Sequence, residues 1–172
     1  FFASIQGTGN NVYRTAVNLG EYGYPHFQFI AEAPVPNLYD RDNRFLDFLL
    51  SARALGPEFT VMINGAFSGA SQRHLHWHGM KRKEGGLWAY VDSLSPPKSG
   101  ETLVREELEN YPGRPILFRG NSSDPLAETI VQEIKHLYDE QISAGVFARV
   151  KLDGSYEVVV APTRGERIVS WE

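Results

Sequence analysis

Three histidines at alternate positions, His74, His76 and His78, constrain this chain more than any other feature of its sequence. Leu75 and Trp77 occupy the positions between them, and successive side chains of a strand point to opposite faces of a sheet. We therefore predict a strand over residues 74–78 that buries the two apolar side chains. The same alternation leaves a row of imidazoles facing a cleft.

A second strand is predicted just before this one. Residues 59–64 read as a buried strand that ends at Asn64, and a turn rich in Gly and small residues, 65–71, follows it. An antiparallel pairing of the two strands would place Asn64 and Ser71 beside the histidine face. Both side chains can donate hydrogen bonds to a phosphate oxygen, although Asn and Ser are also common in turns for purely local reasons.

The row of imidazoles leaves three interpretations open. It could be an exposed strand without chemistry. It could be a metal site, because His at i and i+2 of a strand can bind zinc, but no carboxylate lies nearby and the chain has no Cys. It could also serve nucleophilic catalysis at phosphorus, because a neutral imidazole is a competent nucleophile.

The string His-Leu-His-Trp-His resembles the signature of the histidine-triad (HIT) superfamily. The longer string, Asn64-Gly65 followed by residues 69–76, is similar to one branch, which contains galactose-1-phosphate uridylyltransferase, diadenosine-tetraphosphate phosphorylase and nucleotide-sugar phosphorylases. In that branch a Ser lies three residues before the first His, where this chain has Ser71. The branch usually has Gln at the third motif position, whereas His78 is typical of the hydrolase branch.

The resemblance implies an α+β, HIT-like fold with a largely antiparallel sheet and two main helices. It also implies a nucleotidyltransferase or phosphorylase that acts on a nucleoside diphosphate derivative through a covalent nucleotide on His76, with His74 and His78 fixing the tautomer. A hydrolase, a metal-dependent enzyme and a non-catalytic nucleotide-binding module remain alternatives. The expected catalytic residues are His74, His76, His78 and Ser71, and the expected substrate-binding residues are Asn64, Gly69, Gln72 and Arg164, the last because residues 161–164 resemble the end of phosphorylases of this branch.

Composition narrows the classes of partner. The net charge is −4 and the longest basic run is Lys81-Arg82-Lys83, which disfavours a nucleic-acid groove. The absence of Cys fits a cytoplasmic protein, and no apolar run approaches the roughly 20 residues of a membrane helix. We expect a nucleotide or nucleotide-sugar substrate and no cofactor, with a divalent metal and a homodimer left open.

The remaining pattern completes an α+β order in a single domain, 1–172, which could be a fragment because it begins with Phe. His26 is interpreted as a structural or edge residue, and residues 93–114 as a surface insertion with one helical segment. Predicted strands cover 12–19, 25–36, 87–91 and 115–120, and a predicted hairpin pairs 146–150 with 156–162 around Asp153-Gly154. Predicted helices cover 41–55 and 125–143. Asp40 or Asp42 is expected to cap the first helix, and Gly145 to close the second.

Overall fold

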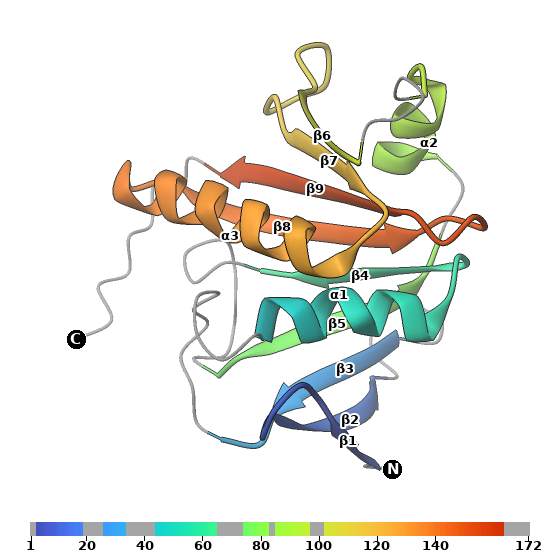
Figure 1. Cartoon of the computed structure of the whole chain (residues 1–172), viewed down its shortest axis with the longest axis vertical. Coiled ribbons are helices and arrows are strands. Elements are labelled where there is room, and N and C mark those ends of the chain that lie inside the picture. Colours follow the sequence, from blue (N-terminus) through green and yellow to red (C-terminus); the bar gives the residue numbers. More distant parts are fainter. Residues whose placement is uncertain are drawn as a thin grey trace.

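The computed structural model describes residues 3–18, 26–33, 44–64, 74–82, 85–96 and 102–163. Four predicted site residues, Gly69, Ser71, Gln72 and Arg164, lie outside these ranges, as do the proposed caps Asp40 and Asp42. The described elements form an α+β fold built on one large antiparallel sheet (Figure 1). No helix among the described residues is long and apolar enough to cross a bilayer.

The sheet contains nine strands in the order β1-β2-β3-β5-β4-β8-β9-β7-β6, and every neighbouring pair is antiparallel. The strands β4 and β5 are central and pair as predicted, with Val61 opposite Gly79 and Met62 opposite His78. The strand bounds are β1 Ala3–Gln6, β2 Val12–Asn18, β3 His26–Ala31, β4 Phe59–Ile63, β5 His76–Lys81, β6 Leu103–Glu107, β7 Ile116–Gly120, β8 Ser143–Val150 and β9 Tyr156–Thr163.

Two helices, α1 (Arg44–Leu55) and α3 (Ser123–Asp139), lie side by side across one face of the sheet, as Figure 1 shows. These are the two main helices that the sequence predicts. The helix α3 buries Leu126, Ile130, Ile134 and Leu137, which recur at helical spacing as expected. Apolar side chains of the sheet, with Trp77 among the largest, complete this core.

The opposite face of the sheet carries a third helix, α2 (Gly86–Ser93). Val158 and Val160 pack in the core under α1 and α3, whereas Val159 packs in a second cluster with Trp88 and Val91 of α2. The strand predicted over 87–91 is therefore wrong. A short apolar run does not distinguish a strand from a buried helix, and here Trp88 and Val91 are buried three residues apart, which is the helical spacing.

Two further predictions require correction. The helical segment expected within 93–114 is wrong, because the charged residues 103–107 form the edge strand β6 on β7. Gly145 does not close α3: that helix ends at Asp139, Gln141 adopts a φ of 60°, and Gly145 lies inside β8. The predicted hairpin is confirmed, with Gly154 at a φ of 82° in the turn between β8 and β9.

Candidate functional site

The histidine motif lies where β5 begins. Leu75 and Trp77 are 2% and 1% exposed and pack in the core under α1, so the predicted alternation of faces is confirmed. The Trp77 ring stacks on Phe29, and its indole N–H donates to Ser51 of α1 at 3.0 Å. The strand starts at His76 rather than at His74, so only its first residues carry the motif. Burial of Trp77 on one face thus fixes the direction of the imidazoles on the other.

His76 is held with one defined ring nitrogen free for chemistry. Its ring is 4% exposed, and Nδ1 lies 2.8 Å from the main-chain carbonyl oxygen of His74. A carbonyl oxygen can only accept, so Nδ1 carries the proton and donates it. The lone pair therefore resides on Nε2, as a nucleophile at phosphorus requires.

His74 supports His76 through its backbone rather than through its ring. Its own Nε2 donates to the carbonyl oxygen of Ala31, the last residue of β3. This contact joins the first residue of the motif to the end of the neighbouring strand, β3. The main-chain N–H of Ala31 in turn donates to the carbonyl of Leu75 at 3.0 Å, which closes the same junction.

His78 is paired with a fourth histidine, His26 of β3. Nδ1 of His78 lies 2.6 Å from Nε2 of His26, and the rings of His76 and His78 are 5.1 Å apart, edge to face. Burial, followed by the nearby His76 and His26, lowers the pKa of His78 to about 4, and burial lowers the pKa of His26. Both rings are therefore neutral at pH 7, and one must donate to the other.

Sequence reasoning missed His26, which it interpreted as a structural or edge residue. The register explains its place: on β3 and β5, Gln28 lies opposite His78 and His26 opposite Met80, so His26 and His78 share a face and are diagonal neighbours. Nothing close to His26 in sequence indicates this pairing. Only the alignment of two strands separated by about 50 residues reveals it.

Asn64 is half-buried and follows β4 directly. Met62, two residues earlier, lies opposite His78 in the register, which places Asn64 near the histidine face. On the β3 side, beside Ala31, a polar recess of about 350 Å³ opens; its lining includes Asn10, Asn11, Glu32 and Arg44.

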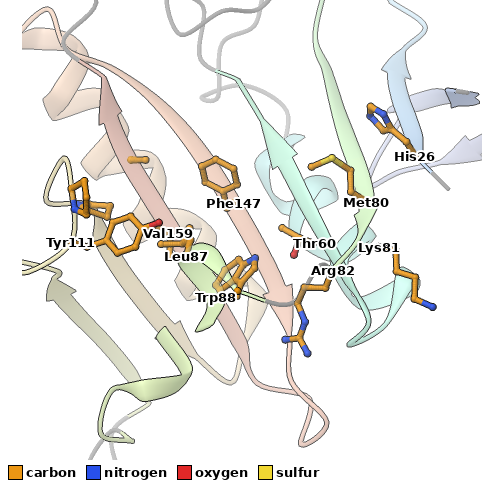
Figure 2. Close-up of a pocket in the computed structure, with 14 residues that line it drawn as sticks. His26, Thr60, Met80, Lys81, Arg82, Leu87, Trp88, Tyr111, Phe147 and Val159 are labelled. Carbon is orange, nitrogen blue, oxygen red and sulfur yellow. The ribbon is translucent and has the colours of Figure 1, made fainter. Parts of the chain in front are cut away.

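A larger pocket of about 460 Å³ lies on the histidine face of the sheet, between β5 and α2 (Figure 2). His26 lies at one end of it and Tyr111 at the other, and Trp88 of α2 lies between them. Because His26 contacts His78, the pocket begins at the histidine cluster. Its lining is mainly apolar, and the residues include Thr60, Met80, Leu87, Tyr111, Phe147, Val159 and Ala161.

The described residues give no geometric support to a metal site. Among them, no three His, Asp or Glu side chains are arranged to hold a metal ion. The ring of His74 is engaged with Ala31, while His78 is engaged with His26. The contacts instead indicate a set of rings that are each directed by a hydrogen bond.

Comparison with known proteins shows the fold. No family model matches the chain, and no curated protein sequence matches it. A solved protein of the family DUF4931 from Bacillus cereus aligns with 93% of this chain and 85% of its own, at a TM-score of 0.67 and 13% identity. Yeast Ap4A phosphorylase Apa2, solved in complex with Ap4A, aligns with 90% of this chain and 58% of its own, at a TM-score of 0.60 and 15% identity.

These likenesses identify the fold of the chain as HIT-like, in agreement with the prediction from the histidine motif. At such low identity they show the architecture alone. The chain spans 58% of the length of the yeast enzyme.

Proposed function

We propose that this chain is a nucleotidyltransferase or phosphorylase that acts on a nucleoside diphosphate derivative, a nucleotide sugar or a dinucleoside polyphosphate, through a covalent nucleotide on His76. The observation that carries the proposal is the hydrogen bond from Nδ1 of His76 to the carbonyl of His74. In the neutral ring it leaves Nε2 unprotonated, on the face of the sheet opposite the main core. The fold shared with a phosphorylase of a dinucleoside polyphosphate supports the same reaction class.

In the first step, the Nε2 lone pair of His76 attacks the α-phosphorus, and the bond from phosphorus to the bridging oxygen breaks. The departing phosphate or phosphate ester takes that oxygen and its electron pair. The intermediate is a nucleotidyl imidazolium, whose Nδ1 keeps its proton and still donates it in the hydrogen bond to the carbonyl of His74. In the second step an acceptor oxygen attacks phosphorus, the N–P bond breaks, the acceptor loses its proton to solvent, and His76 returns to its neutral form.

The remaining motif residues take supporting parts in this proposal. His78 and Asn64 donate hydrogen bonds to the non-bridging phosphoryl oxygens as negative charge develops there. Ser71 and Gln72 do the same from the turn before the strand, Gly69 lets the substrate approach the backbone of that turn, and Arg164 pairs with a phosphate. These last four residues lie outside the described ranges.

A hydrolase is the second candidate, because His78 occupies the position where the transferase branch usually has Gln. The ring of His78 is in place beside His76. In a hydrolase the acceptor oxygen of the second step belongs to water. The first step is the same in both cases, so the two candidates differ only in the acceptor.

Phosphorus NMR with several acceptors tests both candidates. The protein is incubated with nucleotide sugars and dinucleoside polyphosphates, each in buffer alone, with inorganic phosphate, and with a sugar phosphate. Products that form only with phosphate or sugar phosphate establish a phosphorylase or transferase, whereas nucleoside monophosphate formed in buffer alone establishes a hydrolase. Binding without turnover under every condition would contradict both and favour a nucleotide-binding module.

A further inference from the structure

We propose that the pocket between β5 and α2 binds the organic group on the far side of the substrate's phosphates, and that this group is a largely apolar ring system rather than a sugar. The inference rests on the proposed function and narrows its substrate to nucleoside diphosphates that carry an apolar ring group, in place of the nucleotide sugars and dinucleoside polyphosphates named there. It is carried by the position of the pocket, by the chemistry of its lining and by the contacts that fix α2 beside it.

The pocket lies along the same strand as the nucleophile. His76, His78 and Met80 alternate along β5 and therefore face the same side of the sheet, and Met80 lines the pocket. Four residues of a strand span roughly 13 Å, so the pocket begins within that distance of the nucleophile. A substrate with its α-phosphorus at His76 thus directs the groups beyond its phosphates past His78 and His26 into the pocket.

The lining of the pocket favours apolar rings. Trp88, Tyr111 and Phe147 present aromatic surface from three different elements, and Leu87 and Val159 lie among them (Figure 2). A hexose would bring several hydroxyls against this surface, and buried hydroxyls without partners are unfavourable. Burial of an aromatic ring against the same walls is favourable.

One polar group in the pocket wall indicates a ligand contact. Thr60 is 6% exposed, and its hydroxyl oxygen is buried without a hydrogen-bond partner among the described residues. Buried hydroxyls are normally paired, so an unpaired one beside a cavity calls for an explanation. A ring with one polar atom at Thr60 would satisfy it. The two basic residues of the lining, Lys81 and Arg82, are exposed and lie on its solvent side.

Buried charges fix the wall of the pocket that α2 forms. The guanidinium of Arg149 lies 4.4 Å from the centre of the Trp88 ring and donates to Asp92 of α2 and to Glu157 of β9. These contacts fix α2 and its Trp88 against the sheet without any ligand. A pocket that is already formed loses little entropy when a ring enters it.

Calorimetric binding of four phosphate monoesters to the intact chain tests the proposal: 1-naphthyl phosphate, phenyl phosphate, glucose 1-phosphate and AMP. We expect 1-naphthyl phosphate to bind at least tenfold more tightly than glucose 1-phosphate, with phenyl phosphate between them. AMP can also occupy the nucleoside side of the catalytic site, so it serves as a reference and does not enter the ranking. Equal or tighter binding of glucose 1-phosphate would overturn the proposal.

A matched pair of variants locates the binding. Ala161→Phe places a ring inside the pocket, and Ala89→Phe places the same ring on the exposed side of α2. The preference for 1-naphthyl phosphate should fall at least tenfold in Ala161→Phe and stay unchanged in Ala89→Phe. An unchanged preference in a folded Ala161→Phe variant places the ligand elsewhere and overturns the proposal.

These outcomes separate the pocket from the chemistry, because the monoesters bind without reacting. Nucleotidyl transfer combined with a failed ranking would refute only the pocket. A correct ranking combined with no transfer to any acceptor would refute only the proposed function.

Discussion

At the scale of the residue, the chemistry depends on one uncharged nitrogen. Nε2 of His76 is available because a main-chain carbonyl holds the proton on Nδ1. We expect His76→Ala to lower turnover on the order of 10⁴-fold or more with the fold intact, since removal of a nucleophile has effects of this size. Steady-state kinetics on the substrate found by NMR measure the loss.

The matched control is His136→Ala, because His136 is an exposed histidine on α3. It should keep normal turnover, and circular dichroism should show both variants folded. Turnover near the normal rate in His76→Ala would refute the covalent mechanism.

His26 belongs to the residue scale as well, as a positioning residue for His78. If Nε2 of His26 donates across the 2.6 Å contact to Nδ1 of His78, then His78 keeps its proton on Nε2 and can donate it to a phosphoryl oxygen. We expect His26→Phe to lower kcat about tenfold or more, with a smaller change in KM. His26→Gln should retain most of kcat, because its amide can donate at the same reach.

A purely structural role for His26 would predict a different result. Stability, measured by urea unfolding, would then fall in step with activity, and Gln would rescue neither. Equal kcat values for His26→Phe and His26→Gln would contradict the positioning role.

Sequence and structure agree on residues where the pattern is local. The alternation of Leu75 and Trp77 with the histidines predicts which side chains enter the core, because the strand period alone decides it. It does not predict that His74 acts through its carbonyl, nor that His26 reaches His78. The first is a contact between residues two apart, which depends on the rotamer of the His76 ring. The second depends on the register between β3 and β5, which is set by tertiary packing.

At the scale of the element, α2 is attached to the sheet by an apolar cluster and by a buried group of charges. Arg149 is fully buried, lies against Trp88 and pairs with Glu157 and Asp92. Loss of Arg149 leaves the buried Glu157 with Arg119 as its cation, so we expect Arg149→Met to cost about 3 kcal/mol of the free energy of unfolding, the low end for a broken buried pair. Urea denaturation measures this cost, and binding of 1-naphthyl phosphate should weaken with it.

Arg105→Met is the control for that variant. Arg105 pairs with Glu133 on the surface, with half of the Arg105 side chain exposed, so its loss should cost less than about 1 kcal/mol. Similar costs for the two variants would show that the buried cluster is no stronger than a surface pair.

The elements that the sequence predicted wrongly share a physical cause. The run Leu87 to Val91 is short and apolar, and nothing in its neighbourhood distinguishes a strand from a helix that packs on a second face. The strand β6 lies at the edge of the sheet, where exposed charged residues are tolerated. Its sequence therefore lacks the apolar alternation by which a strand is recognised, and it was predicted as part of an insertion with a helical segment. Long periodic elements such as α3 were predicted correctly because they bury a complete stripe.

At the scale of the whole molecule, the two faces of the sheet have separate tasks. One face is covered by α1 and α3 and supplies the main core (Figure 1). The other carries the histidines, the pocket and α2. The alternation of side chains allows one strand, β5, to serve both. Stability and function are therefore coupled through β5, and the titration of its histidines should be visible in the stability of the entire chain.

We expect the free energy of unfolding to fall as pH drops from about 6.5 to about 4. The pKa of His78 is about 4 in the folded chain, against the ordinary histidine value of 6.5 in the unfolded chain, so between these values only the unfolded chain binds the proton. The difference corresponds to about 3 kcal/mol at most; because the ring is only half-buried, solvent screening reduces the expected fall to about 1–2 kcal/mol. The lowered pKa of His26 acts in the same direction.

Urea unfolding at a series of pH values measures this fall, and His26→Phe/His78→Phe should flatten it within that window. Asp92 and Asp153 have pKa values below the usual range for Asp, so their contribution is lost mainly at more acidic pH and remains in the double variant. His136→Ala should leave the wild-type slope unchanged, because His136 is exposed. An equal slope in the double variant and the wild type would mean that the pair of neutral rings is not what makes the folded chain sensitive to acid.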